Sequence, residues 1–342
     1  MKVRIRDIAA KAGVSPATVS NALNGKLGVN NETAAQIQQL AEKMGYVGTK
    51  SPSKVVKANH IRLVMLKKHG LVVMDTQFFM ELIESIEREC HRHQLNLMIS
   101  RIHIGQDPDY MERIRGIARE QCVGVIALST EIDEQDLALF KNCESPFLVL
   151  DNSFLNQPVD SLVMDNFQAG FDSVSCLYNA GHRQIGHITS NVDFSNMQER
   201  RNGFEAAMHR YGLDYDESSF WPVTPTLEGA HSDMLTLLGD GRIPPTAFFA
   251  GNDIIAIGCM RALQENGYTM PGDVSIVGMD DIPMCQFSSP KLTTIRVYRQ
   301  DLGSVAVRML LDLKSSRTEG CVMKTKLSVS LIERDSVAAP SA

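Results

Sequence analysis

Residues Ile5 to Gly25 read IRDIAAKAGVSPATVSNALNG, a stretch that predicts two short helices joined by a tight turn. The first helix carries small apolar residues on one face. It is expected to end at Gly13, because glycine readily adopts the left-handed backbone that follows many helices. Ser15 and Pro16 stand in the order typical of an N-cap and a first helical residue, so they begin the second helix. The stretch therefore predicts a helix-turn-helix whose second helix presents its outer face to DNA.

The charge distribution favours this interpretation over a purely structural pair of alanine-rich helices. Residues 1–60 contain nine lysines and arginines and three acidic residues, whereas the rest of the chain contains 25 basic and 37 acidic residues. A basic head on an acidic body concentrates the attraction for phosphate at one end. The residues expected to contact DNA are Arg4, Arg6, Ser15, Pro16, Ala17, Thr18, Ser20, Asn21 and Asn24. Pro16 and Ala17 offer only apolar contact, so Asn21 is the main candidate for hydrogen bonds to base edges.

A third helix is predicted after this pair. The run VNNETAAQIQQLAEKMGY, Val29 to Tyr46, has apolar residues at helical spacing from Ile37 onward. Together with RIRDIAAKAGVSPATVSNALNG, Arg4 to Gly25, this run closely resembles the head of the LacI/GalR family of bacterial transcription regulators. The resemblance implies a three-helix DNA-binding domain over residues 1–46.

Residues 47–60, VGTKSPSKVVKANH, are basic and largely polar, a composition typical of a flexible linker. The resemblance implies instead a hinge that forms a helix on operator DNA and inserts an apolar side chain into the minor groove. Either Val55 or Val56 would be that wedge, and Lys54 would contact phosphate. The family's usual alanine is Pro52 here, so the register of the wedge stays open.

From Ile61 onward, short apolar runs alternate with helical patterns in two successive sets. The strand-like runs are Ile61–Leu66, Leu95–Ile99, Val123–Leu128 and Phe147–Leu150, then Ser161–Met164, Ile185–Thr189, Thr246–Ala250 and Val274–Val277. Such alternation is typical of parallel sheets covered by helices on both faces. No GxGxxG or GxxxxGK[ST] motif follows any run, which argues against a dinucleotide or nucleoside triphosphate site. We predict an α/β fold with two doubly wound lobes.

Later segments extend the family resemblance over almost the whole chain. They are DNFQAG (Asp165 to Gly170), GHRQIGHIT (Gly181 to Thr189), ERRNGFEAAM (Glu199 to Met208), PPTAFFAGNDIIAIGCMRAL (Pro244 to Leu263), PGDVSIVGMDDIP and SPKLTTIRV (within Pro271 to Val297). They imply a core like that of periplasmic sugar-binding proteins, with a ligand cleft between two lobes. The expected core covers residues 61–334, one lobe over about 61–160 and 296–320, the other over about 161–295 and 321–334, with a tail at 335–342.

The resemblance also implies which residues hold the effector. The matching positions, together with Asp151 from its place after a strand, are Phe78, Phe79, Asp151, Arg200, Asn252 and Asp280. Carboxylates and amides suit the hydroxyl groups of a sugar, and aromatic rings suit its apolar faces. The alternatives are that Asp280 and Asn252 cap helices and that Phe79 is a core residue.

Three positions depart from the family pattern. Asn152 stands where many members have an arginine, and Thr224 and Arg299 stand where several have an aromatic residue. The loop from Lys67 to Val73 is longer than expected. It is either a solvated loop or a contact for an anionic effector or a protein corepressor.

The composition excludes several other classes of protein. No segment reaches the roughly 18 consecutive apolar residues of a membrane span, and no signal-peptide core precedes the basic helix. A cytoplasmic location is expected. Seven widely spaced cysteines indicate neither a disulfide framework nor a metal site, and the histidines form no catalytic or metal-binding set. We expect no enzyme activity and no cofactor.

The sequence therefore predicts a ligand-controlled DNA-binding transcription regulator, a repressor of carbohydrate-use genes whose effector is a sugar or a sugar phosphate. Its expected partners are a palindromic operator DNA and a second copy of the chain, because one reading helix covers only a few base pairs. Alternatives are a non-sugar effector, a protein corepressor or, more distantly, a solute-binding protein. The identity of the effector, the direction of its effect and the operator sequence stay open.

Overall fold

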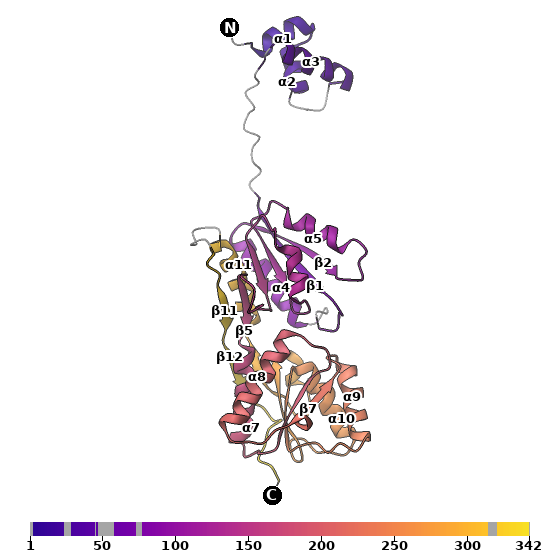
Figure 1. Ribbon diagram of the computed structural model, residues 1–342, viewed down its shortest axis with the longest axis vertical. Helices are drawn as coiled ribbons and strands as arrows, with labels where there is room; N and C mark the ends of the chain where they lie inside the picture. The colour runs from indigo at the N-terminus through magenta and orange to yellow at the C-terminus, as the bar shows by residue number, and fades with distance from the viewer. Residues whose placement is uncertain are drawn as a thin grey trace. The chain divides into compact units, whose positions relative to one another are not determined.

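The computed structural model describes residues 3–23, 29–44, 46, 58–72, 77–313 and 320–341. The chain divides into two compact units, Met1–Lys57 and Ala58–Ala342 (Figure 1). Within the described residues, no helix is both long and apolar enough to cross a membrane. Four residues expected at the DNA lie outside the described part, so their roles stay predictions: Asn24, Lys54, Val55 and Val56.

The N-terminal unit contains the three predicted helices, α1 (Ile5–Ala12), α2 (Pro16–Leu23) and α3 (Asn31–Lys43). Gly13 ends α1 with a φ of 66°, the left-handed conformation that its residue type favours. The Ser15 hydroxyl accepts a hydrogen bond from the Thr18 amide at 3.1 Å and caps α2. Each helix buries apolar side chains in a common core, among them Ile8, Val19 and Ile37. The predicted helix-turn-helix is confirmed.

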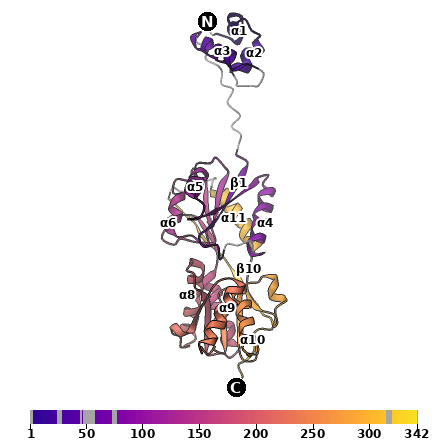
Figure 2. The ribbon, with the colours of Figure 1, turned by 90° about the vertical axis from the view of Figure 1, so that its right-hand side faces the viewer.

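The first lobe of the larger unit is built on a six-stranded sheet in the order β11-β5-β4-β3-β1-β2, in which all paired neighbours are parallel. Its strands are β1 (His60–Lys67), β2 (Asn96–His103), β3 (Gly124–Leu128), β4 (Phe147–Leu150), β5 (Ser161–Met164) and β11 (Lys324–Leu327). Its helices are α4 (Gln77–Arg92), α5 (Tyr110–Ala118), α6 (Glu134–Leu137), η1 (Ala138–Phe140) and α11 (Arg299–Leu313). The helices α4 and α11 cover one face, and α5 and α6 the other (Figure 2).

The second lobe has a sheet of the same size, in the order β12-β10-β9-β8-β6-β7. Its strands are β6 (Ile185–Ser190), β7 (Phe220–Val223), β8 (Ala247–Ala250), β9 (Ser275–Asp280), β10 (Thr293–Val297) and β12 (Val329–Ile332), of which β12 is antiparallel to β10. Its helices are α7 (Asn166–Asn179), α8 (Ser195–Arg210), η2 (Glu217–Ser219), α9 (Leu227–Gly239), α10 (Asp253–Glu265) and η3 (Pro283–Gln286). The predicted α/β core with two parallel-sheet lobes is confirmed.

The lobe boundaries differ from those expected. Ser161–Met164 pairs with β4 and β11 in the first sheet, although the sequence placed it in the second lobe. All of β10 lies in the second sheet, so this part of the second lobe ends after Val297 rather than at 295. The chain crosses between the lobes three times, after β5, after β10 and between β11 and β12. At each crossing the chain passes from one sheet to the other. The local apolar pattern of a strand does not show to which sheet the strand belongs.

The segment expected as a tail packs against the second lobe. Ser336 is fully buried. Its hydroxyl accepts the Thr293 amide at 2.8 Å and donates to the Ile276 carbonyl at 2.6 Å. The His182 ring is within 2.9 Å of the Ala338 carbonyl. Residues 335–338 are therefore part of the folded core.

Candidate functional site

A cavity of about 340 Å³ lies between the two lobes. All six residues expected at the effector line it: Phe78, Phe79, Asp151, Arg200, Asn252 and Asp280. They come from the start of α4, the end of β4, the interior of α8, the start of α10 and the end of β9. Ligand sites of parallel α/β sheets form at the carboxyl ends of their strands, where loops from several elements meet. The fold thus brings all six residues to one place.

Asp280 ends β9 and provides a carboxylate at the cavity wall. Its backbone has a φ of 119°, and the following Asp281 has a φ of 53°, both unusual for residues other than glycine. Burial raises the pKa of Asp280 to about 7; Arg200 and Arg299 act against this rise, whereas Asp253 and Asp151 add to it. Strained backbone and a perturbed carboxyl pKa often coincide at functional sites.

Arg200 is almost fully buried and is held by fixed acceptors from the second lobe and from the crossing after β5. Its Nε donates to the Asn166 Oδ1 at 2.9 Å, and its Nη1 donates to the Gly251 carbonyl at 2.5 Å. Burial lowers the pKa of Arg200, whereas Asp280 and Asp151 raise it. The guanidinium is therefore preorganised beside both carboxylates.

Asp151 belongs to the first lobe but is bonded from both lobes. The Thr130 hydroxyl donates to its Oδ2 at 2.6 Å, and Asn196 from α8 donates to its Oδ1 at 2.9 Å. Asn166 donates to Asn196 at 3.1 Å and accepts from Arg200, which completes a chain of polar contacts across the cleft. Burial raises the pKa of Asp151, and the Thr130 bond opposes that rise. Sequence reasoning did not single out Thr130, Asn166 or Asn196, although Asn166 lies in the DNFQAG segment that carries part of the family resemblance.

The structural alternatives hold in part. The Asn252 Oδ1 accepts the Ile255 amide at 2.8 Å, so Asn252 does cap α10 while it lines the cavity. Phe79 is buried against Phe78 with ring centroids 5.1 Å apart, and both rings also line the cavity. Asp280 caps none of the described helices, because it lies at the end of β9.

Comparisons with known proteins decide the family. The model of bacterial regulatory proteins, lacI family, matches residues 4–48, and that of the periplasmic binding protein-like domain matches residues 174–337. The HTH-type transcriptional regulator GalS of Salmonella typhimurium is 30% identical over 343 residues, which cover 98% of this chain and 97% of that protein. The chain belongs to the lacI family of bacterial regulatory proteins. It is therefore a DNA-binding transcriptional regulator, as the sequence predicted.

Solved structures agree with this assignment. The lac repressor dimer bound to operator and an anti-inducer has the same fold, with a TM-score of 0.72 at 22% identity over 99% of this chain and all of that one. A LacI-family transcriptional regulator from Enterococcus faecium with bound ribose has a TM-score of 0.68 at 26% identity, covering 81% of this chain and 99% of that one.

Two of the three residues that depart from the family pattern, Asn152 and Thr224, do not line the regulator's cavity. The Asn152 amide donates to the carbonyls of Ser129 and Ile132 at 3.1 and 3.2 Å, so it supports the first lobe from inside. The Thr224 amide donates to Asp233 at 2.7 Å, and its hydroxyl accepts from Asn191. Neither side chain is placed to contact a ligand in the cavity.

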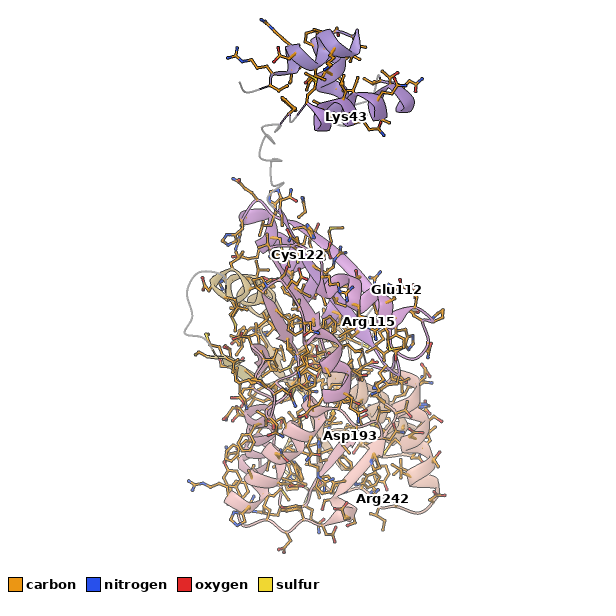
Figure 3. The ribbon with its side chains drawn as sticks, turned by 45° about the horizontal axis from the view of Figure 1, so that its top comes forward. Lys43, Glu112, Arg115, Cys122, Asp193 and Arg242 are labelled. Atoms are coloured by element: carbon orange, nitrogen blue, oxygen red, sulfur yellow. The ribbon has the colours of Figure 1, made fainter. Side chains whose placement is uncertain are left out.

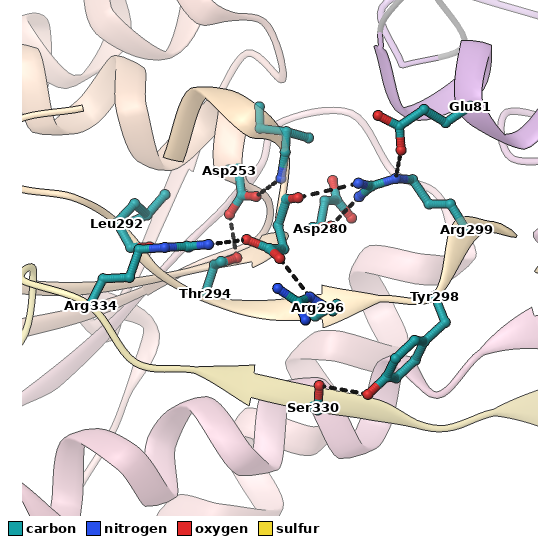
Figure 4. Close-up of polar contacts among 12 residues, drawn as sticks. Glu81, Asp253, Asp280, Leu292, Thr294, Arg296, Tyr298, Arg299, Ser330 and Arg334 are labelled. Atoms are coloured by element: carbon teal, nitrogen blue, oxygen red, sulfur yellow. Dashed lines mark hydrogen bonds and ion pairs between the residues drawn. The ribbon is translucent and has the colours of Figure 1, made fainter. Parts of the chain in front are cut away.

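The third departure, Arg299, joins the lobes of the regulator. It starts α11 of the first lobe, and its Nε donates to Glu81 of α4 at 2.8 Å. Its other nitrogens donate to the carbonyls of Asp280 and Asp281 in the second lobe (Figure 4). Asp281 is further held by Arg296 at 2.7 Å and Arg334 at 2.5 Å. The strained turn that presents Asp280 is thus tied to α4.

The described part of the loop after β1, residues 68–72, contributes to the cavity wall although Lys68 is exposed. The buried Glu131 carboxylate accepts the amides of Lys68, His69, Gly70 and Val72 at 2.8 to 3.1 Å. Leu71 and Val72 line the cavity, and Val72 also packs against the apolar core of the second lobe. The Lys68 ammonium pairs with Asp133 and Asp136 at 2.6 and 3.0 Å. The donors that an anionic effector would need are therefore already occupied.

The residues of the head that are expected to contact DNA are accessible. Arg4, Arg6, Ser15, Pro16 and Ala17 are exposed. The side chains of Thr18, Ser20 and Asn21 are partly exposed on α2. Ser15 and Thr18 share a hydrogen bond at 2.8 Å, which engages the hydroxyls of both. Asn21 therefore stays the main candidate on α2 for hydrogen bonds to bases.

The two histidines of the GHRQIGHIT segment, His182 and His187, are structural. The His187 ring is buried between Phe204 and Phe249, and its Nδ1 lies 3.0 Å from the Phe249 carbonyl. Burial lowers the pKa of His187 to about 4, which keeps the ring neutral. Across the described ranges, no group of three or more metal-binding side chains is placed to hold an ion.

Proposed function

We propose that this regulator represses genes for carbohydrate use and that a sugar or sugar derivative, bound between the lobes, sets its affinity for operator DNA. The observation that carries this proposal is the single cavity lined by all six expected effector residues. Polar groups lie on the Asp151, Arg200 and Asp280 side, and Phe78 and Phe79 supply apolar surface, as a sugar requires. The ribose held by the Enterococcus faecium relative supports the same class of ligand.

The coupling between cavity and head is proposed to be a shift between two lobe arrangements. A ligand that contacts Asp280 and Asp151 touches both lobes at once, and it therefore favours one relative position. Arg299 and Glu81 would transmit the same preference to α4, because they tie the Asp280 turn to that helix. A coupling free energy of about 1 to 3 kcal/mol changes DNA affinity by about 5 to 150-fold, which is sufficient for a switch.

We further propose that two copies of the chain bind a palindromic operator. One α2 helix reads only a few base pairs, so two heads are needed for useful specificity. The larger unit exposes apolar side chains that a second copy would cover, including Met80 at 55%, Met284 at 43% and Phe287 at 85% exposure. Met80 lies on α4 of the first lobe, and Met284 lies on η3 of the second lobe.

The proposal is tested by selecting tight-binding DNA from a random-sequence pool with the full chain. The selected sites are expected to be palindromic. Titration with D-ribose, D-galactose and cellobiose is then expected to change the affinity for the selected DNA by about 5 to 150-fold for at least one sugar, measured by fluorescence anisotropy. Sites without two-fold symmetry would contradict the dimer. A sugar that raises the melting temperature without changing DNA affinity would contradict the coupling.

The role of Asn21 is tested separately. Asn21→Ala is expected to lower the discrimination between the preferred base and its alternatives by about 1 to 3 kcal/mol at one position of each half-site. The effect on binding to random DNA should be small, because phosphate contacts dominate that term. Arg6→Ala is the matched control, expected to weaken binding to all sequences alike and to reduce its salt dependence. Unchanged base preference in Asn21→Ala would remove Asn21 from the reading surface.

A further inference from the structure

We propose that the cavity between the lobes selects an uncharged or ammonium-bearing ligand and excludes the phosphate and carboxylate derivatives of that ligand. The inference rests on the proposed effector role of the cavity and narrows the class of its ligand. It rests on the charged groups that line the cavity and on the contacts that already engage them.

Carboxylates outnumber cations at the cavity wall. Among the described residues that line it, Asp151 and Asp280 are acidic and Arg200 is the only lysine or arginine. The wall carries one excess negative charge when both carboxylates are ionised, which for Asp280 requires a pH above its raised pKa of about 7.

The single guanidinium at the wall is largely engaged. Arg200 donates to Asn166 and to the Gly251 carbonyl, and its Nη2 lies 3.7 Å from the Met164 sulfur. It also provides the counter-charge for the two carboxylates. An anionic ligand would have to compete with Asp151 and Asp280 for the same cation.

The cations around the cavity are engaged as well. Arg299 is occupied by Glu81 and two carbonyls, and Lys68 by Asp133 and Asp136. The amides of the loop after β1 point to Glu131. Successive backbone amides of a loop can hold an anion, but here the protein's own Glu131 carboxylate accepts from them.

Asp280, in contrast to the engaged cations, favours a ligand group that donates a hydrogen bond or carries a positive charge. Among the described residues, no hydrogen bond to its side-chain oxygens is found, and Asp280 lines the cavity. Its pKa near 7 shows that ionisation in this place is already costly. A ligand hydroxyl or ammonium group would supply the missing donor. A second anion would add like-charge repulsion inside a poorly solvated site, which costs about tenfold or more in affinity.

A matched panel tests the inference by thermal shift and calorimetry on the full chain: D-glucose, D-glucosamine, D-glucose 6-phosphate and D-gluconate, with the corresponding galactose and ribose derivatives. Within each set that binds, the neutral or amino compound is expected to bind about tenfold or more tightly than its anionic relative. Tighter binding of a phosphate or carboxylate member would overturn the inference.

A bacterial small-molecule extract, freed of nucleic acid by ultrafiltration and split on an anion exchanger, covers ligands outside the panel. The unretained fraction is expected to raise the melting temperature. Stabilisation by the retained fraction alone would contradict the charge preference but leave the effector role intact. If neither fraction nor any panel compound stabilises the chain, the effector role itself fails, and this inference with it.

Charge-removing variants identify the responsible group. Asp280→Asn is expected to reduce the preference for the amino compound over the neutral one by about tenfold, and to narrow the penalty for the phosphate. Asp193→Asn is the matched control, because Asp193 (Figure 3) is exposed in the neighbouring hollow and does not line this cavity. An equal change in both variants would assign the effect to net charge and overturn the role of Asp280.

Discussion

A chain carrying Arg200→Met is expected to lose about 3 to 5 kcal/mol in the free energy of unfolding of the core and to lose its response to effector. Methionine keeps most of the apolar stem of arginine, so the cavity left behind is small. The charge and the hydrogen bonds, however, are removed from a side chain that is only 5% exposed. Breaking a buried ionic cluster by removing one partner usually costs this much, because the remaining charges stay buried without compensation.

The expected loss of stability in Arg200→Met can be traced to particular atoms. The Gly251 carbonyl and the Asn166 Oδ1 each lose their donor from Arg200. Asp151 and Asp280 lose the cation that lowers the pKa of both. A second substitution, Asp280→Asn, removes one of those uncompensated charges. The double variant is therefore expected to be more stable than Arg200→Met alone at neutral pH, a non-additivity that a double-mutant cycle measures.

The pH dependence gives an independent check. The folded pKa of Asp280, about 7, lies above its ordinary value. Its contribution to stability is therefore complete below about pH 4 and is lost as the pH rises toward 7. Arg200 interacts with Asp280 as an ion pair only when Asp280 is ionised. Arg200→Met should consequently destabilise the core more at pH 8 than at pH 5, as measured by urea denaturation at both values.

Arg201→Met provides the matched control for this prediction. Arg201 is the next residue of α8, but it is partly exposed and pairs with Glu205 and Glu217 at the surface. Arg201→Met is expected to lower the free energy of unfolding by about 1 kcal/mol or less and to change the response to effector little. Equal losses in the two variants would mean that Arg200 contributes through helix packing alone.

The cavity was predictable because its residues lie at positions that a parallel sheet brings together. Asp151 follows β4, Asn252 follows β8 and Asp280 ends β9. Each is a polar residue directly after an apolar run, and carboxyl ends of parallel strands share one edge. Only Asp151 was expected at the cleft from its place after a strand. The family resemblance supplied the other five residues, namely Phe78, Phe79, Arg200, Asn252 and Asp280.

Other features depend on partners that are distant in sequence. Ser161–Met164 is a short apolar strand that would fit either sheet, and its place in the first one depends on β11, which follows about 160 residues later. Asn152 stands beside the site in sequence, yet its amide turns inward to carbonyls of the first lobe. No local pattern distinguishes these outcomes, because long-range packing decides them.

The loop after β1 illustrates the same limit and leads to the second large effect. A solvated loop, or a contact for an anionic effector or a protein corepressor, was expected there. In the structure, four of its backbone amides donate to the Glu131 carboxylate instead. Glu131→Ala is expected to lower the free energy of unfolding by about 3 kcal/mol, because hydrogen bonds to a buried charged acceptor contribute about 1.5 to 3 kcal/mol and several donors are left unpaired together. Differential scanning calorimetry measures this loss.

Chemical rescue distinguishes the lost carboxylate from lost packing. The variant has four freed amides around a vacated carboxylate position that borders the hollow lined by Lys68 and His69. Formate, which supplies two oxygens and a single charge, is expected to restore part of the melting temperature of Glu131→Ala, whereas chloride at equal ionic strength is not. Formate should not raise the melting temperature of the unsubstituted chain, because the Glu131 carboxylate already occupies the position.

Glu134→Ala is the matched control for the rescue. Glu134 lines the same hollow, but it is exposed and bonds only to Gln157 among the contacts described for its side chain. Its replacement should change stability by less than about 0.5 kcal/mol and create no response to formate. If formate stabilised both variants alike, or neither, the loop would be held by Leu71 and Val72 packing rather than by its amides. In that case apolar packing would fix the position of this part of the cavity wall, and the buried charge of Glu131 would not be needed for it.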